Sequence, residues 1–226
     1  MRKASMPERL FAGAGAVLGW FALGLQLRLA VGFSLGRGFS FAHGLIVYFG
    51  FFTVLTNIFV ALVLTIACLR PASRGFFGRQ GTRSAVLVYI AMVAIIYSLL
   101  LRHLWNPGSE QLIADRLLHD VLPPLYLVYW IAFVPKGELR WINPLYWLIY
   151  PVIYFVYILL RGAVIASYPY SFLDAAALGY SRLAVNAFIL LATFLAAGCL
   201  CVAVDRALGR RSLSAPASPA PRSASG

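Results

Sequence analysis

Six long apolar stretches, each nearly free of charged residues, constrain the fold of this chain more than any other feature. A helix that crosses the hydrocarbon core of a bilayer needs about 20 mostly apolar residues. A transmembrane β-barrel would instead show alternating segments of about ten residues. We therefore predict an all-α polytopic membrane protein, a bundle of six transmembrane helices. They cover about 10–31, 44–69, 84–101, 117–134 (with an earlier start near Ser109 left open), 145–160 and 183–204.

The composition excludes a soluble alternative. Of the 226 residues, 62% are hydrophobic and only 12% are charged, whereas ordinary soluble domains are about 45–50% apolar and about 25% charged. So few polar groups cannot cover a globule of this size, and so apolar a chain is not disordered over most of its length.

The positive charge predicts how the helices are oriented. The chain carries 19 Lys and Arg against 7 Asp and Glu, a net charge of +12. Most of these basic residues lie before the first span, after the last, and in the loops that follow spans two and four. Because basic loops stay in the cytoplasm, we expect both termini there, in a multi-pass protein of the cell membrane, a bacterial inner membrane. This explanation of the charge leaves no role for a nucleic-acid partner.

The domain organisation follows from this topology. Residues 1–9 are the expected cytoplasmic N-terminus, and residues 10–206 form the six-helix transmembrane domain. Residues 207–226 are the expected cytoplasmic tail, whose Ser, Ala and Pro content predicts disorder.

Polar residues inside the apolar stretches are the candidate functional residues, because they are expensive in hydrocarbon. Thr53, Thr56 and Asn57 share one face of the second span, being three and four residues apart. The alternative is that they hydrogen-bond between helices and only hold the bundle together.

The fourth span begins with a second polar group. Asp115, Arg116 and His119 fall on one side of a helix, so Asp115 is placed to orient the imidazole, whereas Asp120 faces about 100° away. The alternative is a histidine at a helix end, solvated by lipid headgroups.

A depth estimate connects the two groups. Thr53 and His119 each lie about 15 residues before the cytoplasmic end of their spans, which is roughly 22–24 Å at 1.5 Å per residue. A hydroxyl activated by a histidine base is a nucleophile for acyl transfer. We therefore predict Thr53 and His119 as catalytic residues. Asn57, which would orient Thr53 or donate to an oxyanion, and Asp115 are predicted as supporting residues.

Several other residues carry expectations. Pro123 and Pro124 should bend the fourth span, either for packing or to open a cavity, with neighbours satisfying the freed carbonyls. Arg161 and Asp174 are expected to pair or to bind a headgroup, and Asp205 to pair with Arg206 or the surface. Aromatic residues near span ends are expected in interfacial belts: Trp105, Tyr146, Trp147, Tyr168 and Tyr170.

No cofactor or metal site is predicted. Three widely spaced histidines and the cysteines Cys68, Cys199 and Cys201 match no metal-binding spacing. The sequence also lacks a P-loop, a dinucleotide fingerprint and a G-x-S-x-G elbow.

Three runs carry a family resemblance: Phe52 to Asn57, Leu118 to Pro124, and Tyr168 to Asp174. Over about Leu10 to Arg206 the chain resembles a bacterial family of six-helix integral membrane proteins. It is distantly similar to the eukaryotic androgen-induced-gene membrane proteins, which are threonine hydrolases of fatty acid esters of hydroxy fatty acids.

This resemblance implies roles for two residues. Thr53 matches the threonine of the eukaryotic Phe-Leu-Thr-type motif, and His119 matches the histidine of the His-Thr-Thr-Val-Leu-Pro-type motif. The chain departs from these motifs at Asp120 and Pro124, and at Thr56-Asn57.

Together these observations predict an intramembrane hydrolase of fatty-acyl esters, whose partner is a membrane lipid or a lipid ester substrate. The alternative is a non-enzymatic membrane protein, a small transporter or a lipid-binding subunit, in which Thr53 and His119 lie apart or are separately satisfied. Neither hypothesis fixes the oligomeric state.

Overall fold

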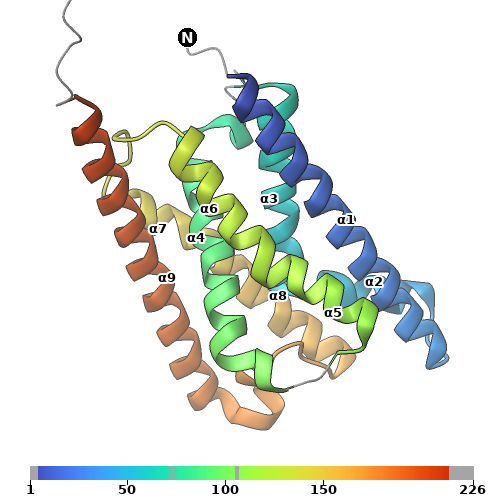
Figure 1. Ribbon diagram of the computed structural model, residues 1–226. Helices are drawn as coiled ribbons and strands as arrows, with labels where there is room; N and C mark the ends of the chain where they lie inside the picture. The colour runs from blue at the N-terminus through green and yellow to red at the C-terminus, as the bar shows by residue number, and fades with distance from the viewer. Residues whose placement is uncertain (1–4, 72, 74, 105–106, 214–226) are drawn as a thin grey trace, which may run out of the picture.

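The computed structural model describes residues 5–71, 73, 75–104 and 107–213, and within these ranges every regular element is a helix (Figure 1). The elements, in order, are α1 (Met6–Gly36), α2 (Phe41–Phe49), α3 (Phe52–Leu69), η1 (Phe76–Gly78), α4 (Gln80–Ile96), η2 (Tyr97–Leu101), η3 (Arg102–Leu104), α5 (Ser109–Arg116), η4 (Leu117–Val121), α6 (Leu122–Phe133), α7 (Asn143–Trp147), α8 (Ile149–Ile165), η5 (Ser171–Leu173) and α9 (Ala175–Leu213). Elements η2 and η4 are π-helical turns, whereas η1, η3 and η5 are 3₁₀ turns.

Five helical segments are long and apolar enough to cross a membrane, as expected of a multi-pass membrane protein. They are Met6–Gly36, Phe52–Leu69, Gln80–Leu104, Asn143–Ile165 and Ala175–Arg210. The other expected span, 117–134, is helical but divided between η4 and α6, and α6 has only 12 residues. The start of α1 and the end of α9 lie at the same end of the bundle (Figure 1).

The ends of the transmembrane region differ from the sequence expectation in length. Helix α1 begins at Met6, where the Ser5 hydroxyl caps it by accepting from the Glu8 amide at 3.3 Å. Helix α9 continues to Leu213, into the segment expected as tail, and residues 214–226 lie outside the described ranges.

The second predicted span is two helices rather than one. Helix α2 ends at Phe49 and is capped by Gly50, and Phe51 is extended (φ −90°, ψ 127°) before α3 begins. The break is held from α8: the Tyr154 hydroxyl donates to the Gly50 carbonyl at 2.8 Å, and the Arg161 guanidinium packs where a Gly50 Cβ would stand, 3.0 Å away. Thr53 therefore lies in the first turn of a helix rather than in the interior of a span.

Small residues let α1 and α3 approach each other closely. A Cβ at Gly19 would lie 3.3 Å from the Ala61 Cβ, and such small-residue contacts are a common way for membrane helices to pack. Helix α6 fills the centre with large side chains, since Tyr126, Tyr129 and Trp130 are all at most 1% exposed. Helix α1 thus packs against both α3 and α6, and α3 contacts the η4 turn that precedes α6.

Asp205 corrects one sequence expectation, because it does not pair with Arg206 or face the surface. It is fully buried and accepts hydrogen bonds from Gln80 Nε2 (2.8 Å), the Gly137 amide (2.9 Å) and the Leu139 amide (3.1 Å). It thereby ties α9 to α4 and to the loop after α6.

Candidate functional site

The π-helical turn η4 leaves a backbone carbonyl without its usual helical donor. The Leu122 amide donates to the Leu117 carbonyl rather than to Leu118, as the wider π register requires. The next two residues, Pro123 and Pro124, have no amide hydrogen to donate. A side chain from α3 compensates: Asn57 Nδ2 donates to the Leu118 carbonyl at 3.4 Å. The expectation that a neighbour satisfies a freed carbonyl is thus met at Leu118.

Thr53 and His119 meet across the contact between α3 and η4. Thr53 Oγ1 lies 3.3 Å from His119 Nε2, and 66 residues separate them in the sequence. Thr53 is 9% exposed, and the His119 side chain is 11% exposed. The two residues selected by the depth estimate are therefore in hydrogen-bonding contact in a largely enclosed place.

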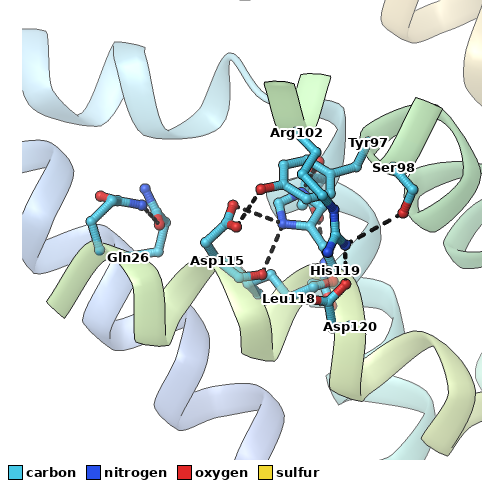
Figure 2. Close-up of polar contacts among 11 residues, drawn as sticks. Gln26, Tyr97, Ser98, Arg102, Asp115, Leu118, His119 and Asp120 are labelled. Carbon is cyan, nitrogen blue, oxygen red and sulfur yellow. Dashed lines mark hydrogen bonds and ion pairs between the residues drawn. The ribbon is translucent and has the colours of Figure 1, made fainter. Parts of the chain in front are cut away.

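The second ring nitrogen of His119 fixes which nitrogen carries the proton in the neutral ring. His119 Nδ1 lies 2.9 Å from the Asp115 backbone carbonyl and 3.2 Å from Asp115 Oδ1 (Figure 2). Both partners are acceptors, so Nδ1 is the protonated nitrogen. Nε2 then has a free lone pair directed at the Thr53 hydroxyl. A hydroxyl, an imidazole and a carboxylate in this order have the geometry that a nucleophile, a base and an orienting group require.

Tyr97, from the other π-helical turn, completes the support of His119. Its ring stacks on the imidazole, with centroids 3.8 Å apart and planes 17° apart, and its hydroxyl donates to Asp115 Oδ2 (Figure 2). The two π turns therefore meet at this site, and π turns within α-helices occur frequently at functional sites. Sequence reasoning missed Tyr97, because nothing in an apolar run identifies which tyrosine faces a histidine.

Asp120 points away from this group, as its position in the helix predicts. It forms an ion pair with Arg102, whose guanidinium also lies 5.2 Å from the centre of the Tyr97 ring (Figure 2). The side chains of the pair are 42% and 31% exposed. Asp120 is therefore a partner of Arg102 rather than of the imidazole.

Asn57 supports the site through the backbone. It is fully buried, and Nδ2 donates to the Thr53 carbonyl at 2.9 Å as well as to Leu118. Its amide hydrogens are thus directed at two carbonyls rather than at the Thr53 hydroxyl. Thr56, on the same face, bonds the Tyr150 hydroxyl at 3.1 Å, so the structural alternative of holding helices together describes Thr56.

Tyr170 does not lie where the sequence analysis expected it. Instead of lying in an interfacial belt, it is 7% exposed and lines the space beside Thr53. Burial raises the pKa of its phenol, although the Thr53 hydroxyl and the amides of Thr53 and Phe52 oppose that shift. Trp147 is likewise buried (7% exposed), whereas Tyr146 is exposed as expected. Trp105 lies outside the described residues.

Arg161 and Asp174 do not pair with each other. Arg161 donates to the carbonyls of Ile46 (3.3 Å) and Ser167 (3.0 Å), and Asp174 caps α9 by accepting from the amides of Ala176 and Ala177, each at 3.0 Å. Their contacts hold the loop 166–174 that carries Tyr170.

Two cavities share Thr53, Tyr97, Leu101 and Tyr170 as a common wall. One extends among α4, α8 and α9, and the other reaches α1 and α5. Over the described ranges, no cluster of three or more His, Cys, Asp or Glu side chains is placed to hold a metal ion.

No family model matches the chain, and neither a curated protein nor a solved structure matches it. The functional assignment therefore depends on the chemistry of the site.

Proposed function

We propose that this chain is a six-span protein of the bacterial inner membrane, with both termini cytoplasmic, that hydrolyses lipid esters. Thr53 is the nucleophile and His119 the general base. The observation that carries the proposal is the 3.3 Å contact between Thr53 Oγ1 and His119 Nε2, with Nδ1 held by Asp115. The resemblance to membrane threonine hydrolases supports the same two residues.

In the first step, Thr53 Oγ1 attacks the ester carbonyl carbon and its proton passes to His119 Nε2. The tetrahedral intermediate collapses, the bond to the alcohol oxygen breaks, and His119 returns the proton to that oxygen. The products are an acyl-Thr53 ester and the free alcohol.

In the second step, water attacks the acyl-Thr53 carbonyl while His119 takes one of its protons. The bond to Thr53 Oγ1 breaks, the hydroxyl regains the proton, and the fatty acid leaves. Asp115 keeps Nδ1–H oriented and stabilises the imidazolium that exists between proton transfers.

The oxyanion formed in both steps needs donors near Thr53. The amide hydrogens of Asn57 are directed at carbonyls, so we assign the role to Tyr170 and to the first-turn amides of α3. The phenol of Tyr170 lies beside the Thr53 hydroxyl and the amides of Phe52 and Thr53. Phe51, at the helix cap, has no side-chain acceptor to occupy these amides.

The test is turnover of a fluorogenic long-chain acyl ester by purified protein in lipid nanodiscs. We expect Thr53→Ala and His119→Ala each to lower kcat about 10³-fold or more, while Thr53→Ser keeps measurable turnover. His103→Ala and Thr193→Ala are matched controls, since both residues are exposed and neither lines either cavity.

Equal turnover in wild type, Thr53→Ala and His119→Ala would rule out this mechanism. An inactive wild-type protein, tested across acyl esters of several chain lengths, would instead favour the transporter or lipid-binding alternative.

A further inference from the structure

The cavity among α4, α8 and α9 has the character of a binding site for a hydrocarbon chain. We call it the tail chamber. The only side-chain polar atoms among its lining residues are the hydroxyls of Thr53, Tyr97, Tyr154 and Tyr170, and three of these are engaged, by His119, Asp115 and Gly50. The rest of the wall is apolar and includes Val93, Ile96, Phe155, Leu190, Leu191 and Phe194.

The second cavity, which we call the head chamber, is polar at the end away from the tail chamber. Gln26 of α1 and Gln111 of α5 line it, together with Asp115 and His119. Gln111 Nε2 donates to Gln26 Oε1 at 2.9 Å. The side-chain NH₂ group of Gln26 and the side-chain carbonyl oxygen of Gln111 remain to bind a ligand. A primary amide pair of this kind recognises hydroxyl groups, which both donate and accept.

The charges around the head chamber select against an anionic ligand. Its lining contains the Asp115 carboxylate, and no lining residue that the structure describes is Lys or Arg. Two cations on neighbouring elements are already paired: Arg28 with Glu110 at 2.8 Å, and Arg102 with Asp120. A carboxylate placed beside Asp115, with little water to screen the two charges, would be strongly repelled.

We infer that the two chambers bind one ester molecule, a single fatty-acyl chain joined to a small neutral polyol such as glycerol. The acyl chain occupies the tail chamber, the polyol occupies the head chamber against Gln26 and Gln111, and the ester carbonyl lies at Thr53 in the common wall. The cleavage products are then a fatty acid and the free polyol, by the two steps above. The cleavage of this substrate rests on the proposed function, whereas its binding to the two chambers does not.

The inference differs from what the family resemblance implies. A fatty acid ester of a hydroxy fatty acid ends in a free carboxylate on its alcohol portion. That carboxylate would enter the head chamber and meet Asp115 with no Lys or Arg in the described lining to pair with it. The two substrate classes therefore make opposite predictions about charge.

The experiment measures binding of non-hydrolysable ligands to the full chain in nanodiscs, by displacement of a fluorescent fatty acyl probe. The two ligands are an alkyl glycerol ether and an alkyl ether of equal length that ends in a carboxylate. We expect the glycerol ether to bind at least about tenfold more tightly, a difference of about 1.4 kcal/mol. Equal binding, or tighter binding of the carboxylate, would overturn the inference.

Three variants and one control test where each end of the ligand lies. Leu190→Trp should fill the tail chamber and lower the affinity for both ethers, whereas Val185→Trp, on an exposed part of α9, should leave them unchanged. Gln111→Leu should lower affinity for the glycerol ether alone. Gln111→Lys should raise affinity for the carboxylate ligand, a gain that misfolding cannot produce. The placement of the ligand in the two chambers would be overturned if Leu190→Trp changed the affinity for neither ligand. It would also be overturned if Gln111→Lys left the affinity for the carboxylate ligand unchanged.

The two proposals fail in different ways. If the glycerol ether is preferred but wild-type protein turns over no ester, the hydrolase proposal fails and the binding inference stands. If Thr53-dependent turnover is observed but the carboxylate ligand binds more tightly, the hydrolase proposal stands and the substrate inference fails.

Discussion

Two buried aspartates at opposite ends of the bundle have different kinds of partner. Asp205, near the end of α9, receives one side-chain amide and two backbone amides. Asp115, on α5, receives the ring nitrogen of His119 and the hydroxyl of Tyr97. They are 0% and 5% exposed, so burial does not distinguish them. Figure 1 shows α5 far from the end of α9.

The difference separates a structural carboxylate from one suited to chemistry. Backbone amides cannot lose their protons or move independently of the fold, so Asp205 has a fixed role as an acceptor. The partners of Asp115 include an imidazole, the side chain most often used in general acid–base catalysis, and that imidazole contacts a hydroxyl facing two cavities. The partners of a buried acidic group therefore say more about its role than its burial does.

The largest effect is expected on stability, at Asp205. Asp205→Ala leaves three donors without their acceptor, and a buried unsatisfied group costs about 1–3 kcal/mol. We expect the free energy of unfolding in detergent to fall by about 3 kcal/mol or more, while turnover per folded molecule stays at the wild-type value. A variant with unchanged stability, or with a selective loss of kcat, would break the comparison.

A smaller effect, on catalysis alone, is expected at Tyr170. Tyr170→Phe removes the proposed donor to the oxyanion, and loss of one such donor costs about 10²–10³-fold in kcat. Because two amides remain, we expect about a hundredfold loss with little change in KM. Tyr180→Phe, at a residue 84% exposed, is the matched control. An unchanged kcat in Tyr170→Phe would remove the phenol from the mechanism.

Asp115→Asn should have a milder effect on turnover than removal of the base. The Asp115 backbone carbonyl, 2.9 Å from His119 Nδ1, remains and keeps the proton on that nitrogen. Asp115→Asn therefore removes only the stabilisation of the positively charged imidazolium by the carboxylate. We expect kcat to fall about tenfold, which is less than the 10²–10⁴-fold that a general base contributes. Asp205→Asn, measured alongside, should show full turnover per folded molecule. Equal losses in the two variants would mean that Asp115 acts only on the fold.

The smallest effect is expected at Asp120, which is adjacent to His119 in sequence. Its ion pair with Arg102 is partly exposed, and such pairs contribute about 0–1 kcal/mol. Asp120→Asn should change both kcat and the free energy of unfolding little, with kcat within about threefold of wild type. A loss comparable to that of Asp115→Asn would place Asp120 in the catalytic group.

Much of the fold follows from the sequence, because long uncharged runs have few alternatives to apolar helices. The positions at which these helices are interrupted could not be predicted from the sequence in the same way. The separation of α2 from α3 depends on Tyr154 and Arg161, which lie about 100 residues away in sequence. The fourth span is divided by a π turn whose freed carbonyl is satisfied by Asn57. Such breaks depend on long-range partners that periodicity does not reveal.

The site was partly predictable for a similar reason. Depth along a helix can be counted from a sequence, and it places Thr53 and His119 at one level. Rotation about the helix axis and the choice of neighbours cannot be counted. Tyr97 and Tyr170 were therefore missed as members of the site, although Tyr170 lies in one of the runs that carry the family resemblance.

The π turn η4 also bears on how this arrangement tolerates changes in chain length. Such a turn contains one residue more than the regular helix needs. Removing one residue between Leu117 and Val121 would restore regular pitch and rotate α5 by about 100° relative to α6. Asp115 would then turn away from Tyr97, although the segment would remain helical. The alignment of the proposed catalytic residues thus depends on a count of residues as much as on their identity.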